Sequence, residues 1–245
     1  MATAKITSSL HEPRVQISLD LTSIDEALHV AEIALAAGVD WLEAGTPLIL
    51  AEGLRGVRAL HERFPTIPIV ADLKTMDGGY LEVEMMARAG ASWYVVMGVA
   101  HPATITACVA AARHYGIGIM GDLLAAPDKV GTARMLQELG VDVIIVHTGF
   151  DERRAVSGAS PWDDLAAVVA AVVAAVVAAV DLPIQAVGGL RLADLPRLPA
   201  AGAPLVVVGA PLVIDAEAFR ASESDDERLA RIIREVVAAV KGTRA

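Results

Sequence analysis

The 245-residue sequence contains a single cysteine, Cys108, which excludes an internal disulfide and a cysteine-rich metal site. Basic side chains are also scarce, with 20 Lys and Arg against 30 Asp and Glu, a formal charge of −10. Nucleic-acid binding depends on Lys and Arg that neutralise phosphates, so this balance argues against a nucleic-acid partner. The residues up to Pro13 contain no apolar core of the kind found in secretory signals. Hydrophobic residues, in contrast, make up 55% of the chain, which excludes disorder and predicts a soluble, cytoplasmic α/β protein.

One long apolar run raises the question of whether the chain spans a membrane. From Ala166 to Val180, Ala-Ala and Val-Val pairs alternate, and aspartates flank the run at 163, 164 and 181. A helix of this length spans about 22 Å, less than the roughly 30 Å of a hydrocarbon core. We therefore expect no membrane span. Two interpretations of a helix over 165–180 stay open: compositional drift, or a helix buried on both faces that joins subunits into a larger assembly.

Short apolar runs alternate with amphipathic stretches along the whole chain, which predicts eight βα units. The expected strands are 15–20, 39–44, 67–73, 92–97, 117–122, 141–147, 183–187 and 204–208, and the expected helices include 24–37, 51–63, 80–89, 104–114 and 129–139. Eight such units fit a (β/α)8 TIM barrel over residues 15–245, with an N-terminal extension over residues 1–14. An open doubly wound sheet is the alternative. Its first turn usually carries glycines, whereas residues 20–24 contain none.

Polar residues gather where the expected strands end. In a (β/α)8 barrel the functional groups project from the C-terminal ends of the strands and the loops that follow. Each polar residue alone has a structural explanation, such as a loop cap or a hydrogen-bonded core histidine. Seven at one end of a barrel predict an active site, because isolated charges beside apolar strands are costly. These residues are Asp20, Glu43, Asp72, Lys74, Asp77, Asp122 and His147.

The residue types in this cluster indicate a chemistry. Glu43 and Asp72 offer hard oxygen ligands to Mg²⁺, or to Mn²⁺. Lys74 lies two residues after Asp72, which in an extended strand places both side chains on the same side. It can hold an anionic oxygen or form a Schiff base, and the neighbouring carboxylates favour the charged, electrostatic role. With His147 as a proton shuttle, the set suits formation of an enediolate from a hydroxy-ketone.

Glycines follow the last two expected strands. Barrels often bind phosphate through backbone N–H groups of the loops in this region. Gly188 and Gly189 follow the seventh strand, and Gly209 and Ala210 follow the eighth. The sequence therefore predicts a phosphate site there and a small phosphorylated sugar as the substrate.

Residues 71–79 read Ala-Asp-Leu-Lys-Thr-Met-Asp-Gly-Gly and contain the pattern D-x-K-x-x-D. This pattern resembles the signature of the orotidine-5′-phosphate decarboxylase suprafamily, and its Lys-Thr-Met-Asp core resembles the 3-hexulose-6-phosphate synthase branch. The same resemblance is carried by residues 15–21, 43–48, 52–54, 121–123, 147–152 and 186–189. It extends from about Val15 to about Phe219.

The resemblance implies an aldolase that uses Mg²⁺ to condense formaldehyde with ribulose 5-phosphate into hexulose 6-phosphate, or to catalyse the reverse cleavage. Glu43 and Asp72 would hold the metal, Lys74 would stabilise the enediolate, and His147 would move the proton. Asp77 would reach into the neighbouring active site of a homodimer. The catalytic set is completed by Asp20 and Asp122, and the phosphate cradle by Gly188, Gly189, Gly209 and Ala210.

Two other functions stay open. The first is that of a 3-keto-L-gulonate-6-phosphate decarboxylase, which shares the metal, the lysine and the enediolate. That branch typically has Arg where this chain has Phe150 and Glu where it has Asp122. The second is a barrel retained as an assembly scaffold, which would not need an intact cluster. Orotidine-5′-phosphate decarboxylase itself is disfavoured, because its pattern has a Lys in place of Glu43.

The chain also departs from the synthase pattern at two places. His101 and Pro102 follow the fourth expected strand, where synthases usually have acidic residues. Ala210 and Pro211 replace the glycine-rich pair often seen after the eighth strand. The first departure predicts a different mouth of the site, and the second predicts a reshaped phosphate loop.

Overall fold

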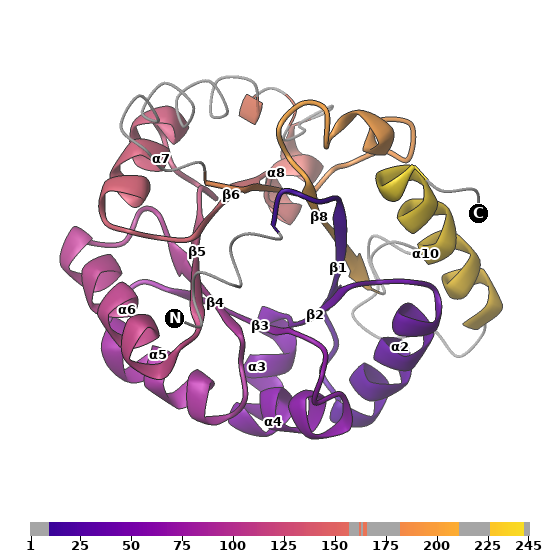
Figure 1. Ribbon diagram of the computed structural model, residues 1–245, viewed down its shortest axis with the longest axis horizontal. Coiled ribbons are helices and arrows are strands. Elements are labelled where there is room, and N and C mark those ends of the chain that lie inside the picture. The colour runs from indigo at the N-terminus through magenta and orange to yellow at the C-terminus, as the bar shows by residue number, and fades with distance from the viewer. Residues whose placement is uncertain (1–9, 157–161, 163, 166–181, 211–225, 243–245) are drawn as a thin grey trace.

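The computed structural model describes residues 10–156, 162, 164–165, 182–210 and 226–242, which form a closed barrel of parallel strands surrounded by helices (Figure 1). The strands follow one another around the barrel in chain order, and β1 pairs with β8 to close it. This confirms the predicted single-domain (β/α)8 barrel. The strands are β1 Arg14–Leu19, β2 Trp41–Ala44, β3 Ile69–Thr75, β4 Trp93–Met97, β5 Gly118–Asp122, β6 Val143–His147, β7 Ile184–Val187 and β8 Leu205–Ala210.

The helices expected over 24–37, 80–89, 104–114 and 129–139 are present, whereas the one expected after β2 is not a single helix. The described helices are α2 Ile24–Ala36, α3 Thr46–Glu52, α4 Leu54–Arg63, α5 Gly79–Arg88, α6 Pro102–Tyr115, α7 Lys129–Glu138, α8 Phe150–Ala155, α10 Asp226–Lys241 and the 3-10 turn η2 Leu195–Arg197. The single helix predicted over 51–63 is wrong. Gly53 has a φ of 60° and donates its N–H to the Ile49 carbonyl at 2.8 Å, which ends α3 and lets α4 start in a new direction.

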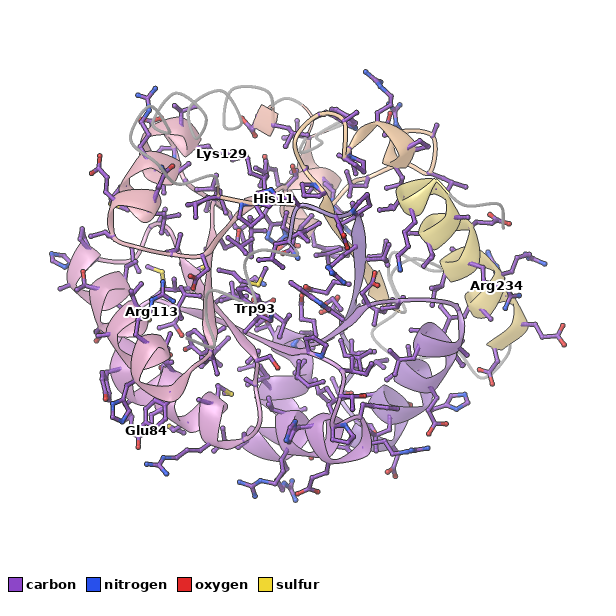
Figure 2. The ribbon with its side chains drawn as sticks, in the orientation of Figure 1. His11, Glu84, Trp93, Arg113, Lys129 and Arg234 are labelled. Atoms are coloured by element: carbon purple, nitrogen blue, oxygen red, sulfur yellow. The ribbon has the colours of Figure 1, made fainter. Side chains whose placement is uncertain are left out.

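Apolar side chains fill one end of the barrel interior. The rings of Trp41 and Trp93 stack there with their centroids 5.3 Å apart, and Trp93 points into the middle of the barrel (Figure 2). Leu10, from the segment predicted as an N-terminal extension, is 1% exposed and packs into the same interior cluster. Leu10 therefore belongs to the core of the barrel, whereas His11 and Glu12, which follow it, are exposed. Other members of the interior cluster are Val70, Val95, Met120, Val143, Ile145 and Leu205.

The alternation of the strands carries polar side chains to the opposite end of the interior. Successive side chains of a strand point to opposite faces, so a residue two positions after an inward apolar residue also points inward. Four strands follow this rule at their C-terminal ends. The pairs are Trp41 and Glu43, Val70 and Asp72, Met120 and Asp122, and Ile145 and His147.

Among the described residues, none of the helices combines the length and apolar character needed to cross a membrane. The alternating Ala/Val run at 166–180 lies outside the described residues. Both interpretations of that run, including the larger assembly, therefore remain predictions.

Candidate active site

A cavity of about 690 Å³ opens at the C-terminal end of the strands. Six of the seven polar residues predicted from the sequence line it, and so do three of the predicted phosphate-binding glycines. The six are Asp20, Glu43, Asp72, Lys74, Asp122 and His147, and the three are Gly188, Gly189 and Gly209.

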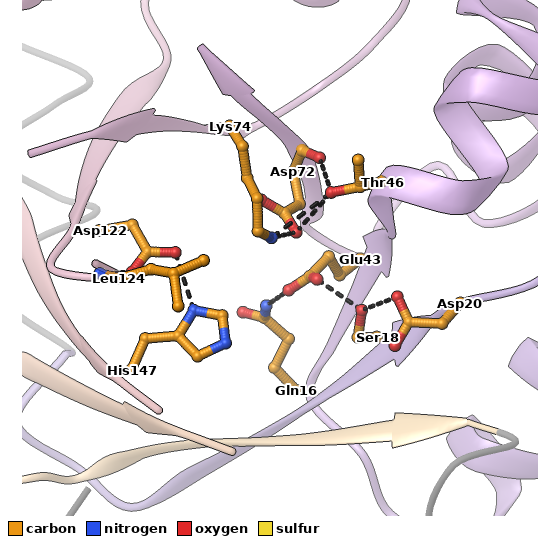
Figure 3. Close-up of polar contacts among 10 residues, drawn as sticks. All are labelled: Gln16, Ser18, Asp20, Glu43, Thr46, Asp72, Lys74, Asp122, Leu124 and His147. Atoms are coloured by element: carbon orange, nitrogen blue, oxygen red, sulfur yellow. Dashed lines mark hydrogen bonds and ion pairs between the residues drawn. The ribbon is translucent and has the colours of Figure 1, made fainter. Parts of the chain in front are cut away.

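Glu43 lies at the bottom of the cavity in a hydrogen-bonded group of side chains from β1 and β2 (Figure 3). The Ser18 hydroxyl donates to Glu43 Oε1 at 2.5 Å and lies 3.1 Å from Asp20 Oδ1. The Gln16 amide donates to Glu43 Oε2, and Gln185 donates to Gln16 Oε1 at 3.0 Å. Burial, followed by the charges of Asp72 and Asp20, raises the pKa of Glu43 to about 8. Burial and Asp72 likewise raise the pKa of Asp20 to about 6.

Asp72 and Lys74 meet in the same wall of the cavity, although β3 is not extended at Lys74. Lys74 has a φ of 52°, and the pairing of β3 with β4 shifts register between Ala71 and Thr75. The expectation that simple strand alternation brings the two side chains together is therefore wrong. The Lys74 ammonium nevertheless donates to Asp72 Oδ2 and lies 3.4 Å from Thr46 Oγ1. Burial alone would lower the pKa of Lys74, but Asp72 and Asp122 raise it above its ordinary value, so the lysine is charged.

The residue after Lys74 is fixed by a second polar group behind the strand. The Thr75 hydroxyl donates to Glu82 Oε2 of α5 at 2.5 Å and is hydrogen-bonded to the Tyr94 hydroxyl. The Tyr94 hydroxyl also lies 3.1 Å from Glu82 Oε2. A left-handed backbone at a non-glycine residue is unfavourable and persists only where its surroundings impose it. We infer that this group, which we call the Thr75 clamp, holds the backbone that aims Lys74 into the cavity.

Asp122 and His147 form a hydrogen-bonded pair, which lies across Glu43 from Ser18 and Asp20 (Figure 3). His147 Nδ1 lies 2.9 Å from Asp122 Oδ2, and Asp122 Oδ1 accepts the backbone N–H of Leu124 at 2.8 Å. Burial favours the neutral carboxyl, but His147 and Lys74 outweigh it and lower the pKa of Asp122. A carboxylate at Nδ1 fixes the orientation of the imidazole and leaves Nε2 for a partner in the cavity.

The glycine loop after β7 approaches the end of β6 closely. Gly188 has a φ of 83°, and a Cβ at this position would lie 2.1 Å from the Thr148 carbonyl oxygen. Any larger residue would force the loop away from the cavity that Gly188 and Gly189 line. The loop is therefore shaped to bring backbone close to a ligand.

The donor set at the bottom of the cavity fits a divalent cation. Glu43 and Asp72 lie on neighbouring strands, and Asp72 Oδ1 is buried without a hydrogen-bond partner among the described residues. Burial and, after it, the negative charges of Asp72 and Asp20 raise the pKa of Glu43, and a cation would relieve this crowding of charge. In the part of the chain that the structure describes, no three His, Cys, Asp or Glu side chains could hold an ion by themselves. Mg²⁺, which prefers few carboxylates plus water and substrate oxygens, suits such a pair.

Three sequence predictions fall outside the cavity or at its edge. Asp77 is exposed in the loop between β3 and α5 and does not line the cavity of its own chain. Ala210 is the last residue of β8, next to Gly209. His101 is exposed at the start of α6, where its Nδ1 accepts the N–H of Ala103 at 3.1 Å. His101 therefore acts as a helix cap, and the roles predicted for Asp77 and Ala210 remain predictions.

Sequence reasoning missed several polar residues of the site. Gln16 and Ser18 precede Asp20 at two-residue spacing, so the alternation along β1 could have placed them in the interior. Thr46, Gln185 and Arg153 carried no comparable signal, because their positions depend on contacts between distant elements. All of these except Gln16 line the cavity.

The sequence model of the Orotidine 5'-phosphate decarboxylase / HUMPS family matches residues 13–223, and the chain belongs to that family. It is 36% identical over 195 residues to 3-hexulose-6-phosphate synthase from Methylomonas aminofaciens, covering 80% of this chain and 88% of that protein. It is 35% identical to the synthase from Mycobacterium gastri over 80% and 89% of the two chains. A solved structure of 3-hexulose-6-phosphate synthase superposes with a TM-score of 0.79 at 33% identity, covering 92% of this chain and 99% of that one. The resemblance found in the sequence is thereby confirmed.

Proposed function

We propose that this protein is a Mg²⁺-dependent aldolase that joins formaldehyde to ribulose 5-phosphate and also cleaves the resulting hexulose 6-phosphate. The observation that carries the proposal is the meeting of Glu43, Asp72, Lys74 and His147 in one cavity. The similarity to the synthases supports it independently. Mg²⁺, or Mn²⁺, held by Glu43 and Asp72 would supply Lewis-acid polarisation of the substrate oxygens.

The side chains divide the proton transfer and the stabilisation of charge between them. His147, with Asp122 at its Nδ1, takes a proton from the hydroxymethyl carbon next to the substrate carbonyl. The resulting enediolate is negatively charged, and the Lys74 ammonium lies in the cavity wall to stabilise it. The enediolate carbon then attacks the carbon of formaldehyde. The alkoxide formed takes up the proton that His147 holds, so atoms and charge balance without an oxidant or a reductant.

A homodimer with shared active sites is part of this proposal. Asp77 is exposed, and large apolar side chains are exposed around it in the same loop and along α5, namely Met76, Tyr80, Leu81 and Met85. A monomer rarely exposes a cluster of this kind. If a second copy covers this surface, Asp77 of one chain would lie at the cavity of the other chain, as the resemblance implies.

The test compares two reactions of the purified protein in the presence of Mg²⁺. The proposal expects formaldehyde to disappear in proportion to hexulose 6-phosphate formed from ribulose 5-phosphate. It expects release of CO₂ from 3-keto-L-gulonate 6-phosphate to be at least about a hundredfold slower in kcat/KM. Faster release of CO₂ than consumption of formaldehyde would overturn the proposal in favour of a decarboxylase.

A further inference from the structure

The cavity wall is strongly acidic, which is unfavourable for a phosphorylated substrate. Six Asp and Glu side chains line it, and among the described residues the positively charged side chains that line it are Lys74 and Arg153. Lys74 is already hydrogen-bonded to Asp72. A phosphate dianion that enters this cavity needs a further cation. The six Asp and Glu side chains are Asp20, Glu43, Asp72, Asp122, Asp151 and Glu152.

Arg153 is a cation with few partners of its own. It lies on α8, half-buried, and its Nε donates to the Gly149 carbonyl at 3.3 Å. Its guanidinium carbon lies 5.7 Å from the centroid of the Phe150 ring. No carboxylate within the described residues forms an ion pair with it, and burial accordingly lowers the pKa of Arg153 below its ordinary value. A guanidinium has five N–H donors, and among the described residues one of those of Arg153, at Nε, has a hydrogen-bond partner.

Arg153 lies on the side of the barrel where we expect the phosphate of the substrate rather than its reacting carbons. α8 follows β6, which pairs with β7, and the glycines that line the cavity after β7 and near the end of β8 lie at this side. Lys74 lies on β3, which is four strands from β7 in the closed barrel and so faces it across the cavity. A sugar phosphate that spans the cavity would place its reacting end near Lys74 and its phosphate near the glycines and Arg153.

We propose that Arg153 binds the phosphate group of the substrate and supplies the charge that the glycine loops cannot. A guanidinium can donate two parallel hydrogen bonds to phosphate oxygens, which a single ammonium cannot match in geometry. The inference rests on the proposed function for the identity of the sugar phosphate. It does not require that turnover occurs.

The test measures binding by calorimetry in the presence of Mg²⁺, with ribulose 5-phosphate and with inorganic phosphate as probes. Arg153→Gln should weaken the binding of both probes by roughly tenfold or more, because a charge-assisted hydrogen bond is lost. Arg153→Lys should lose less, because it keeps the charge. Arg154→Gln is the matched control, since Arg154 is the next residue of the same helix, is exposed and does not line the cavity. It should bind both probes like the parent.

A purely structural role for Arg153 would give a different pattern. Loss of its bond to the Gly149 carbonyl would lower the melting temperature and leave the affinity of the folded protein for phosphate within twofold of the parent. That result for Arg153→Gln, or for Arg153→Lys if the first variant does not fold, would overturn the inference. If the parent binds ribulose 5-phosphate in an Arg153-dependent way but forms no hexulose 6-phosphate, the proposed function fails and this inference stands.

Discussion

The ammonium of Lys74 donates a hydrogen bond to the carboxylate of Asp72 two residues earlier on β3, across a backbone that is left-handed at Lys74. The contact joins the residue expected to stabilise the enediolate to a residue expected to hold the metal. It also keeps the lysine charged, since Asp72 raises the pKa of Lys74 against the effect of burial. A permanently charged lysine is suited to electrostatic stabilisation and unsuited to attack on a carbonyl as a free amine.

Replacing Lys74 should therefore abolish most of the activity and leave the fold intact. Lys74→Ala removes a charge that acts on the transition state, and we expect kcat/KM to fall by about three orders of magnitude. Lys241→Ala is the control, because Lys241 also pairs with a carboxylate, Asp40, but lies on α10 outside the cavity. Steady-state kinetics decide the matter. Activity of Lys74→Ala within a few-fold of the parent would show that the role given to this lysine is wrong.

The Thr75 clamp should matter for turnover more than for substrate binding. Thr75 does not line the cavity, so Thr75→Val should lower kcat by roughly tenfold, through a misplaced Lys74, with a smaller change in KM. Thr75→Ser keeps the hydroxyl and should restore most of kcat. Thr106→Val, at an exposed threonine on α6 that bonds to the Pro102 carbonyl, is the control. An unchanged kcat in a folded Thr75→Val protein would refute the clamp.

The melting temperature of the protein should depend on pH through the buried carboxyl group of Glu43. Folding raises the pKa of Glu43 from 4.5 to about 8. The contribution of the protonated Glu43 carboxyl to the free energy of unfolding is therefore complete below pH 4.5 and is lost as the pH rises through about 8. Glu43→Gln resembles the neutral form. With metal removed by chelation, this variant should melt at a higher temperature than the parent at about pH 9, with the difference shrinking toward about pH 5.

Exposed Glu138 on α7 provides the control for that measurement, and Glu138→Gln should show little change in melting temperature across the same pH range. Addition of Mg²⁺ should stabilise the parent more than Glu43→Gln at high pH, since the ion compensates the carboxylates. A parent that is more stable than Glu43→Gln at high pH without metal would contradict the account of this cluster.

A shared active site should be detectable by mixing inactive variants. Asp77→Asn and Lys74→Ala should each be nearly inactive alone. In a mixed dimer one site would combine an intact Lys74 with the intact Asp77 of the other chain, so random mixing should restore about a quarter of the active sites. The measurement is activity after the two proteins are unfolded and refolded together. Mixtures that stay as inactive as the separate variants would argue against a site completed by a second copy.

The sequence predicts the barrel and most of the site because both depend on local patterns. Short apolar strands carry Glu43, Asp72, Asp122 and His147 at or near their C-terminal ends, and the closed barrel brings these ends together. The pattern fails where the backbone leaves regular geometry. Neither the positive φ of Gly53, which divides a predicted helix, nor that of Lys74 is visible in the hydrophobic periodicity.

Long-range polar contacts are the other limit of sequence reasoning. Thr75, Glu82 and Tyr94 come from a strand, a helix and a second strand, and they meet where the pairing of β3 with β4 shifts register between Ala71 and Thr75. The same holds for the amide of Gln185, which reaches Gln16 across 169 residues of sequence. Such contacts follow from the closure of the barrel and can be read only from its three-dimensional structure.

The proposed reaction of this cavity is the formation of a carbon–carbon bond between formaldehyde and a sugar phosphate. Incubation of the purified protein with isotopically labelled formaldehyde, ribulose 5-phosphate and Mg²⁺, followed by NMR, tests it most directly. The label should appear at the terminal hydroxymethyl carbon of a hexulose 6-phosphate, and EDTA should prevent this. Label that stays in formaldehyde, with a folded protein that binds ribulose 5-phosphate, would contradict the account.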